Sequence, residues 1–232
     1  MKVKLLRHTA DAELLCGAAA STSTKRGRPS EILEKMDAET AKHLIKRVTG
    51  YGHASVIEHA SFTFSIEDVS RVMTHQLVRH RIASYTQQSQ RYVKYDTLEK
   101  YVTPQSIASN FEAKKVFDET LEKISETYQK LLTMGISKED ARFILPNAAK
   151  TNIIVTMNAR ELRHFFNLRC CARAQWEIRE VAVEMLRQAK KAAPVLFEDC
   201  GPACVELGWC AEGKMKPPEC NIPEIKERFR KL

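Results

Sequence analysis

Apolar and polar side chains alternate from residue 60 to 67, where Phe62, Phe64 and Ile66 are separated by small polar residues. A period of two is typical of a strand with one buried face. The run NIIVTM at 152–157 predicts a second strand. Elsewhere the apolar residues recur every three or four positions, which is the spacing of an amphipathic helix. This spacing predicts helices over 31–49, 69–80, 117–134, 137–145, 159–169 and 173–192.

The residues between these elements predict how they are joined. The segment Ser21–Ser30 (STSTKRGRPS) is typical of an exposed loop before a helix. Asp68 is expected to cap the helix that follows the first strand. That helix would carry Gln76 and His80 beside its apolar stripe, with Arg79 on a neighbouring face, and would end in a polar loop.

Composition favours one folded domain of mixed helix and strand. Of the 232 residues, 44% are hydrophobic and 28% are charged, which excludes a disordered or fibrous chain. No apolar run approaches the roughly 20 residues of a membrane-spanning helix. The first residues carry basic side chains at Lys2, Lys4 and Arg7 and no secretory apolar stretch. We therefore expect no membrane partner and a cytoplasmic location.

The charge balance indicates an anionic ligand. Lysine and arginine number 37 against 29 acidic residues, a formal net charge of +8. This excess suits nucleic acids, nucleotides or other phosphorylated molecules, so a nucleic-acid-binding protein is an alternative to an enzyme. The sequence contains neither GxxxxGK[ST] nor GxGxxG, the two common backbone cradles for phosphate. Any phosphate must therefore be held by side chains.

The densest polar cluster lies at 79–92 and reads RHRIASYTQQSQRY. It alternates guanidinium groups with hydroxyl and amide side chains. Such groups can grip a phosphate and read the edge of a planar heterocycle. A surface loop is sometimes this polar for solubility alone. The position of this cluster directly after a predicted core helix favours a binding role.

The cluster resembles the signature of the flavin-dependent thymidylate synthases, which is RHR, seven residues and then a serine. Here the signature reads Arg79, His80 and Arg81, then residues 82–88, then Ser89. The resemblance extends from about residue 21 to 193. Three further segments match the family in order: GHASVIEH at 52–59, TMNARELRHFFNLR at 156–169 and AQWEIRE at 174–180.

The resemblance implies an α/β fold for a domain at residues 1–195. Residues 196–232 lie outside the resemblance and are expected to form a cysteine-containing tail. It also implies a homotetramer whose active sites lie at subunit interfaces. The cofactor would be FAD, and NADPH would reduce it. The residues that the resemblance places at FAD are Ser21, His53, Ser55, Arg79, His80, Arg81, Gln87, Asn158, Arg160 and His164.

The implied reaction transfers a methylene from methylenetetrahydrofolate to carbon 5 of dUMP, followed by a hydride from reduced FAD. The products would be dTMP and tetrahydrofolate, and no nucleic acid would take part. An arginine beside the uracil amide can stabilise negative charge that develops on the ring, which makes Arg169 the catalytic candidate. The residues placed at dUMP are Gln76, Arg79, Gln87, Gln88, Ser89, Gln90, Arg91, Arg142 and Arg169.

Three positions depart from the family pattern. Thr86 and Gln87 stand where typical members carry Asn and often Glu, which changes the charge beside the nucleotide. His164 replaces a smaller amide in its helix. Arg173 adds a positive charge near the expected site, and no role is assigned to it.

The seven cysteines are an odd number, which favours reduced thiols over a disulfide framework. Four tail cysteines match the number of ligands in a structural zinc site but lack a CxxC pair, so zinc, a disulfide and free thiols remain open. A zinc-stabilised interaction protein is accordingly a third class of function. The histidines lack HExxH or another ligand spacing, and we expect no metal in the active site. The tail cysteines are Cys200, Cys204, Cys210 and Cys220.

Overall fold

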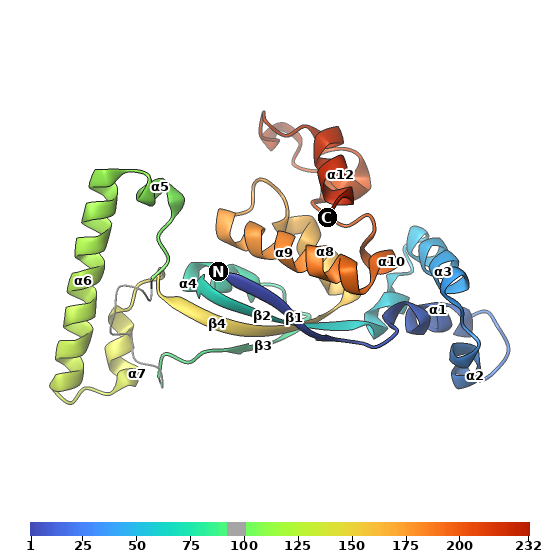
Figure 1. The fold of residues 1–232 in the computed structure, drawn as a ribbon, viewed down its shortest axis with the longest axis horizontal. Helices are drawn as coiled ribbons and strands as arrows, with labels where there is room; N and C mark the ends of the chain where they lie inside the picture. The colour runs from blue at the N-terminus through green and yellow to red at the C-terminus, as the bar shows by residue number, and fades with distance from the viewer. Residues whose placement is uncertain (92–100) are drawn as a thin grey trace. The chain divides into compact units, whose positions relative to one another are not determined.

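The structure, a computed structural model, describes residues 1–91 and 101–232 (Figure 1). The described residues form a mixed α/β fold with a four-stranded sheet in the order β1-β2-β4-β3. Thr63 pairs with Thr156 through their hydroxyls at 2.9 Å, and the Asp68 amide donates to Asn152 Oδ1 at 2.9 Å, so β2 and β4 run antiparallel. The strands are β1 Lys2–His8, β2 Ser61–Ser70, β3 Ala83–Gln87 and β4 Lys150–Asn158.

Helices occupy most of the remaining described chain (Figure 1). Before the last strand they are α1 Ala12–Thr22, α2 Pro29–Glu34, α3 Ala38–Gly50, α4 Arg71–Leu77, α5 Gln105–Ala108, α6 Phe111–Thr133 and α7 Lys138–Ala141. After it they are α8 Ala159–Arg169, α9 Trp176–Ala192, α10 Pro194–Phe197, α11 Ala203–Leu207 and α12 Ile222–Arg230. Short 3-10 turns are η1 Ala54–His59, η3 Arg142–Ile144 and η4 Gly213–Met215.

The chain divides into two compact units, and β2, β3 and β4 each contribute residues to both. Unit 1 consists of Met1–Lys2, Ile66–Val78 and the described part of Thr86–Ile153. Unit 2 consists of Val3–Ser65, Arg79–Tyr85 and Ile154–Leu232. The predicted site residues are divided by these ranges, because Gln76, residues 87–91 and Arg142 belong to unit 1, whereas residues 79–81 and 158–169 belong to unit 2.

The core of unit 1 forms along one face of the long helix α6. Leu121 and Tyr128 of α6 are buried together with Tyr101, Ala141 and Ala149. Tyr101 and Ala149 also form an isolated antiparallel bridge. The opposite face of α6 is rich in charged residues, as expected for an amphipathic helix.

The core of unit 2 is aromatic. Phe62 of β2 and Phe166 of α8 each pack edge-on against Phe197 of α10, with ring centroids 5.2 and 6.0 Å apart. Helices α8 and α9 pack against each other, and α1 packs against α3. A Cβ on Gly17 would lie 2.7 Å from Ala41, so only glycine permits this approach of α1 to α3.

Several predicted elements are confirmed. Both predicted strands are present as parts of β2 and β4, and the helix predicted at 159–169 coincides with α8. The long predicted helix is α6, which ends before Gly135 in the left-handed conformation, at φ 86°. Ser137 caps α7 by accepting from the Asp140 amide at 3.3 Å. The helix predicted from residue 173 begins at Trp176, after Gln175 as its cap.

Two predicted segments are wrong near the N-terminal end. The helix predicted over 31–49 is two helices, because the Asp37 carboxylate accepts from the Thr40 amide at 2.8 Å and starts α3 as a new helix. The loop predicted at 21–30 is shorter, since Ser21 and Thr22 belong to α1 and α2 begins at Pro29. The strands β1 and β3 and the helix α1 were not predicted from the sequence.

The helix predicted over 69–80 is wrong at both ends. Asp68 is not its cap but a strand residue with φ 56°, and Ser70 caps α4 by accepting from the Met73 amide at 3.1 Å. The helix ends at Leu77, so His80 lies beyond it and not beside Gln76 on one stripe. Within 1–91 and 101–232, no helix is long and apolar enough to cross a membrane.

Candidate active site

The RHR residues lie in the turn between α4 and β3 and belong to unit 2. Arg79 and Arg81 are exposed, whereas the His80 between them is only 4% exposed. The Tyr85 hydroxyl donates to the His80 carbonyl oxygen at 2.7 Å and fixes the turn from the following strand. The alternation therefore presents two guanidinium groups to solvent and buries the imidazole that separates them.

The His80 ring joins two residues of α8. Arg169 Nε donates to His80 Nε2 at 3.0 Å, and His80 Nδ1 faces Glu161 Oε1 at 3.6 Å. The ring also packs edge-on against Phe165, with centroids 4.9 Å apart. Because Nε2 accepts from Arg169, the proton of the neutral ring is on Nδ1, toward Glu161.

Burial sets the charge states in this cluster. Burial, with smaller electrostatic contributions from Arg169 and His164, lowers the pKa of His80 to about 4, so the imidazole is neutral at pH 7. Burial also raises the pKa of Glu161, against the opposing effect of His164. The pKa of Arg169 is lowered by burial, but a guanidinium remains protonated in proteins. The positively charged guanidinium of Arg169 therefore donates to the imidazole of His80, which is neutral.

Helix α8 places these groups through its own spacing. Asn158 caps the helix by accepting from the Glu161 amide at 2.9 Å. Glu161, Phe165 and Arg169 follow at four-residue intervals and share one face. A carboxylate in the first turn and a guanidinium in the last turn both match the polarity of the helix dipole.

The other predicted FAD residues of unit 2 are mostly exposed. His53, Ser55 and His164 are exposed, and Arg160 forms an ion pair with Glu58 at 2.6 Å. Ser21 is the exception because it is fully buried. Within the described chain, the Ser21 hydroxyl oxygen has no hydrogen-bond partner.

The predicted nucleotide residues of unit 1 form a polar strip at the end of β3. Gln87 donates to the hydroxyls of Thr74 and Thr151, at 2.9 and 3.3 Å. The side-chain amide of Asn152 donates to Gln88 Oε1 at 3.2 Å. The side-chain amide of Gln87 therefore donates hydrogen bonds to two hydroxyl groups, so an uncharged side chain has hydrogen-bond partners at this position.

The strip continues through the turn that follows β3. Ser89 Oγ accepts from the Arg91 amide at 3.2 Å, and Arg91 forms an ion pair with Glu139 at 2.9 Å. Arg142 donates from Nε to the Glu139 carbonyl oxygen at 3.0 Å. Gln76 and Gln90 are half-buried, and Tyr92, the last residue of the polar cluster, lies outside the described residues.

Comparisons with known proteins decide the family. Residues 4–195 match the family model described as thymidylate synthase complementing protein. The chain is 49% identical over 235 residues to a flavin-dependent thymidylate synthase of Geobacter sulfurreducens, covering 100% of this chain and 99% of the relative. The chain belongs to the flavin-dependent thymidylate synthase family.

Two further comparisons agree with this family. A flavin-dependent thymidylate synthase of Pyrococcus horikoshii is 48% identical, over 100% of this chain and 98% of the relative. The crystal structure of the flavin-dependent thymidylate synthase ThyX from Helicobacter pylori, complexed with FAD and dUMP, superposes with a TM-score of 0.70. It is 26% identical and covers 87% of this chain and 100% of its own. The mixed α/β fold is therefore that of the family.

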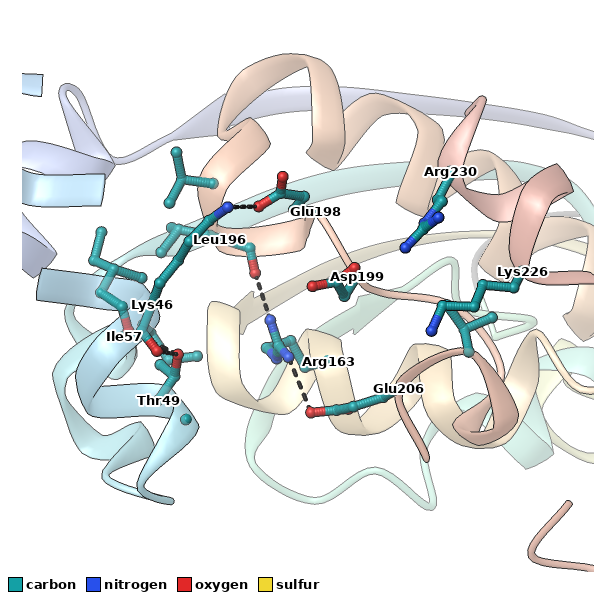
Figure 2. A pocket seen from close by; sticks show the side chains of 14 residues that line it. Lys46, Thr49, Ile57, Arg163, Leu196, Glu198, Asp199, Glu206, Lys226 and Arg230 are labelled. Carbon is teal, nitrogen blue, oxygen red and sulfur yellow. Dashed lines mark hydrogen bonds and ion pairs between the residues drawn. The ribbon is translucent and has the colours of Figure 1, made fainter. Parts of the chain in front are cut away.

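A separate cavity of about 410 Å³ lies within unit 2 (Figure 2). Its wall contains the ion pairs Lys46–Glu198 and Arg163–Glu206, and Arg163 also donates to the Leu196 carbonyl oxygen at 2.9 Å. None of its 14 lining residues is a predicted site residue of this flavin-dependent synthase. The predicted FAD and dUMP residues therefore belong to other surfaces.

The cysteines are free thiols in this synthase. Burial raises the pKa of Cys204, and electrostatic contributions from Cys171, Cys210 and Cys220 raise it further. Cys200 is buried apart, where burial raises its pKa to about 11. Across residues 1–91 and 101–232, no group of three or more histidine, cysteine or acidic side chains is arranged to hold a metal ion.

Sequence reasoning missed Glu161 and Tyr85. A glutamate three residues after a capping asparagine is typical of a helix start, so Glu161 had a structural explanation already. Its contact with His80 spans 81 positions and leaves no local pattern. Tyr85 was placed inside the polar cluster without a role, because β3 itself was not predicted.

Proposed function

We propose that this chain synthesises dTMP from dUMP with 5,10-methylenetetrahydrofolate as the carbon donor and reduced FAD as the hydride donor. The observation that carries the proposal is the end-to-end similarity to relatives named flavin-dependent thymidylate synthase. The signature from Arg79 to Ser89 lies within the matched range. Tetrahydrofolate is the expected second product.

The residues proposed to bind FAD suit an anionic cofactor. Arg79, Arg81 and Arg160 present exposed guanidinium groups, which match a pyrophosphate better than an ammonium does. The buried Ser21 hydroxyl has an unused hydrogen-bonding capacity in the described chain. FAD, when bound, supplies the hydride. The remaining proposed contacts are His53, Ser55, His80, Gln87, Asn158 and His164.

The residues proposed to bind dUMP combine cations with amide and hydroxyl groups. Arg91 and Arg142 would take the phosphate together with Ser89, and the glutamines would bond to the base and sugar. The Arg91–Glu139 pair has both side chains about half exposed, so a dianionic phosphate can compete for Arg91. The other proposed contacts are Gln76, Arg79, Gln87, Gln88 and Gln90.

Arg169 would stabilise negative charge on the uracil ring during methylene transfer. Its guanidinium is preorganised by His80, so little reorganisation is needed when charge develops. Ser89 would bind and orient dUMP and would not attack it. A nucleophilic serine needs a base within hydrogen-bond reach, and its neighbours Gln88, Gln90 and Arg91 cannot accept its proton.

Two parts of the proposal concern what lies outside one chain. NADPH would reduce FAD before each turnover. A homotetramer would complete the site, because exposed side chains such as His53 and Ser55 are available to a neighbouring subunit. We place the reaction in the cytoplasm, where free thiols such as the seven in this chain persist.

The test is a spectrum followed by an assay. The purified protein with added FAD should show bound-flavin absorbance and should form dTMP from dUMP, methylenetetrahydrofolate and NADPH. Light scattering should give the mass of a tetramer. A colourless protein that binds RNA with steep salt dependence and forms no dTMP would overturn the proposal.

A further inference from the structure

We propose that Glu161 and His80 are positioning residues for Arg169. Glu161 acts on the reaction only through His80 and Arg169. This inference rests on the proposed function, because it concerns the catalytic role of Arg169. All three residues belong to unit 2, and two of the three are almost completely buried, with Glu161 7% and His80 4% exposed. Their contacts therefore exist within one subunit before any ligand binds.

The geometry makes His80 a bridge between the two ends of α8. Glu161 is in the first turn and Arg169 is the last residue, so their backbones are about 12 Å apart along the axis. The His80 ring packs edge-on against Phe165, which is midway between Glu161 and Arg169 along the helix. Its Nδ1 faces Glu161 and its Nε2 accepts from Arg169. A rigid aromatic ring thereby couples the carboxyl group of Glu161 to the guanidinium of Arg169.

The hydrogen-bond direction depends on the tautomer of His80. Arg169 can donate to Nε2 only while that nitrogen carries no proton. A carboxylate facing Nδ1 at 3.6 Å favours the tautomer with its proton on Nδ1. Without Glu161, the ring can place its proton on Nε2, which would face the Arg169 Nε–H and push the guanidinium away. Glu161 thus favours the tautomer of His80 in which Nε2 can accept from Arg169.

The surroundings of the ring support this arrangement. Among the described residues, the groups that interact with His80 include Glu161, His164, Arg169 and the Tyr85 hydroxyl, which donates to the His80 backbone carbonyl. Burial, with Arg169 and His164, keeps the pKa of His80 near 4, so the ring is an acceptor at working pH. Protonation of His80 would instead give two donors and break the contact with Arg169.

A double-mutant cycle tests the coupling. Glu161→Gln keeps the shape of the side chain but removes its charge, and it should lower the turnover number about 10-fold with little change in FAD content or dUMP affinity. In an Arg169→Lys background, which lacks the Nε–H, the same change should have an effect of less than twofold. Glu161→Asp, which keeps the charge, should restore part of the lost turnover.

Glu177→Gln is the matched control. Glu177 is also a buried glutamate in the first turn of a helix behind a side-chain cap, and it is 2% exposed. It is not part of the His80 cluster, so its effect on turnover should be small and equal in both backgrounds. Melting temperatures would show whether either variant loses stability.

Two results would overturn the positioning role. One is an unchanged turnover number in Glu161→Gln, and the other is an equal loss in the wild-type and Arg169→Lys backgrounds. Failure of the proposed function would be recognised separately, because the unaltered chain would then form no dTMP. A loss confined to FAD content would assign Glu161 to cofactor binding instead.

Discussion

The two units hold their predicted site residues in different ways. In unit 2, Arg169 is fixed by a buried imidazole at 3.0 Å, and that imidazole is fixed in turn by Phe165 and Glu161. In unit 1, Arg91 is held by Glu139 in an ion pair whose side chains are 48% and 49% exposed. The Gln88 side chain accepts from the Asn152 side-chain amide, and Ser89 Oγ accepts from the Arg91 backbone amide.

This difference separates two kinds of functional residue. A buried, multiply contacted group keeps its geometry without ligand and suits the stabilisation of charge during a reaction. An exposed ion pair contributes little to stability and exchanges readily with a charged ligand. We therefore expect changes in unit 2 to reduce turnover and changes in unit 1 to alter nucleotide affinity.

The largest expected effect is that of Arg169→Lys. Lysine keeps the charge but has neither the planar guanidinium nor the Nε–H that His80 accepts. The turnover number should fall about 100-fold or more, while FAD content stays the same. Arg173→Lys, an exposed residue paired with Glu212, is the control and should stay within twofold. A normal turnover number for Arg169→Lys would remove Arg169 from the catalytic role.

Ser89→Ala should have the next largest effect. Loss of a hydroxyl that bonds to a charged ligand costs roughly 1.5 to 3 kcal/mol, so dUMP affinity should fall about 10- to 100-fold. Single-turnover dTMP formation at saturating dUMP should remain near the original rate. The exposed neighbour Ser84→Ala serves as control. If product formation vanishes while dUMP still binds, Ser89 is a nucleophile.

Acid should weaken unit 2 through His80. The pKa of His80 is about 4 in the folded chain and about 6.5 when unfolded, so the unfolded state binds more protons between these values. The free energy of unfolding should therefore fall as the pH is lowered from 6.5 to 4. Glu161 opposes this trend, because its raised pKa favours folding at low pH.

The contribution of His80 is isolated by comparison with His80→Asn. The difference in unfolding free energy between the two proteins should narrow by roughly 3 kcal/mol from pH 7 to pH 4. Denaturant unfolding at fixed pH values measures it. A gap that stays constant across this range would show that His80 is not held neutral.

The smallest expected effect is that of Glu139→Gln in unit 1. Removing the carboxylate takes away one competitor for Arg91, so dUMP should bind about two- to threefold more tightly. Isothermal titration with dUMP measures the change, and Glu112→Gln on α6 is the control. Weaker binding would mean that Glu139 orients Arg91 and does not compete for it.

The contrast between local patterns and contacts over long sequence separations explains which parts of the molecule could be predicted from the sequence. Local periodicity was sufficient for α6, α8 and the strands β2 and β4, because each buries one regular face. It failed at Asp37 and Ser70, where a single side-chain cap ended one element and began another. The RHR motif identified Arg79 to Arg81, but no local pattern shows that His80 is buried against Arg169, 89 positions away.

The most direct test of the central claim is an anaerobic single turnover with prereduced FAD, dUMP and methylenetetrahydrofolate, and no NADPH. One dTMP should form for each flavin reoxidised, with tetrahydrofolate as the folate product. Glu161→Gln should slow this step and leave the amount of bound flavin unchanged. Formation of dTMP with dihydrofolate and without flavin oxidation would show that the folate, and not FAD, supplies the hydride.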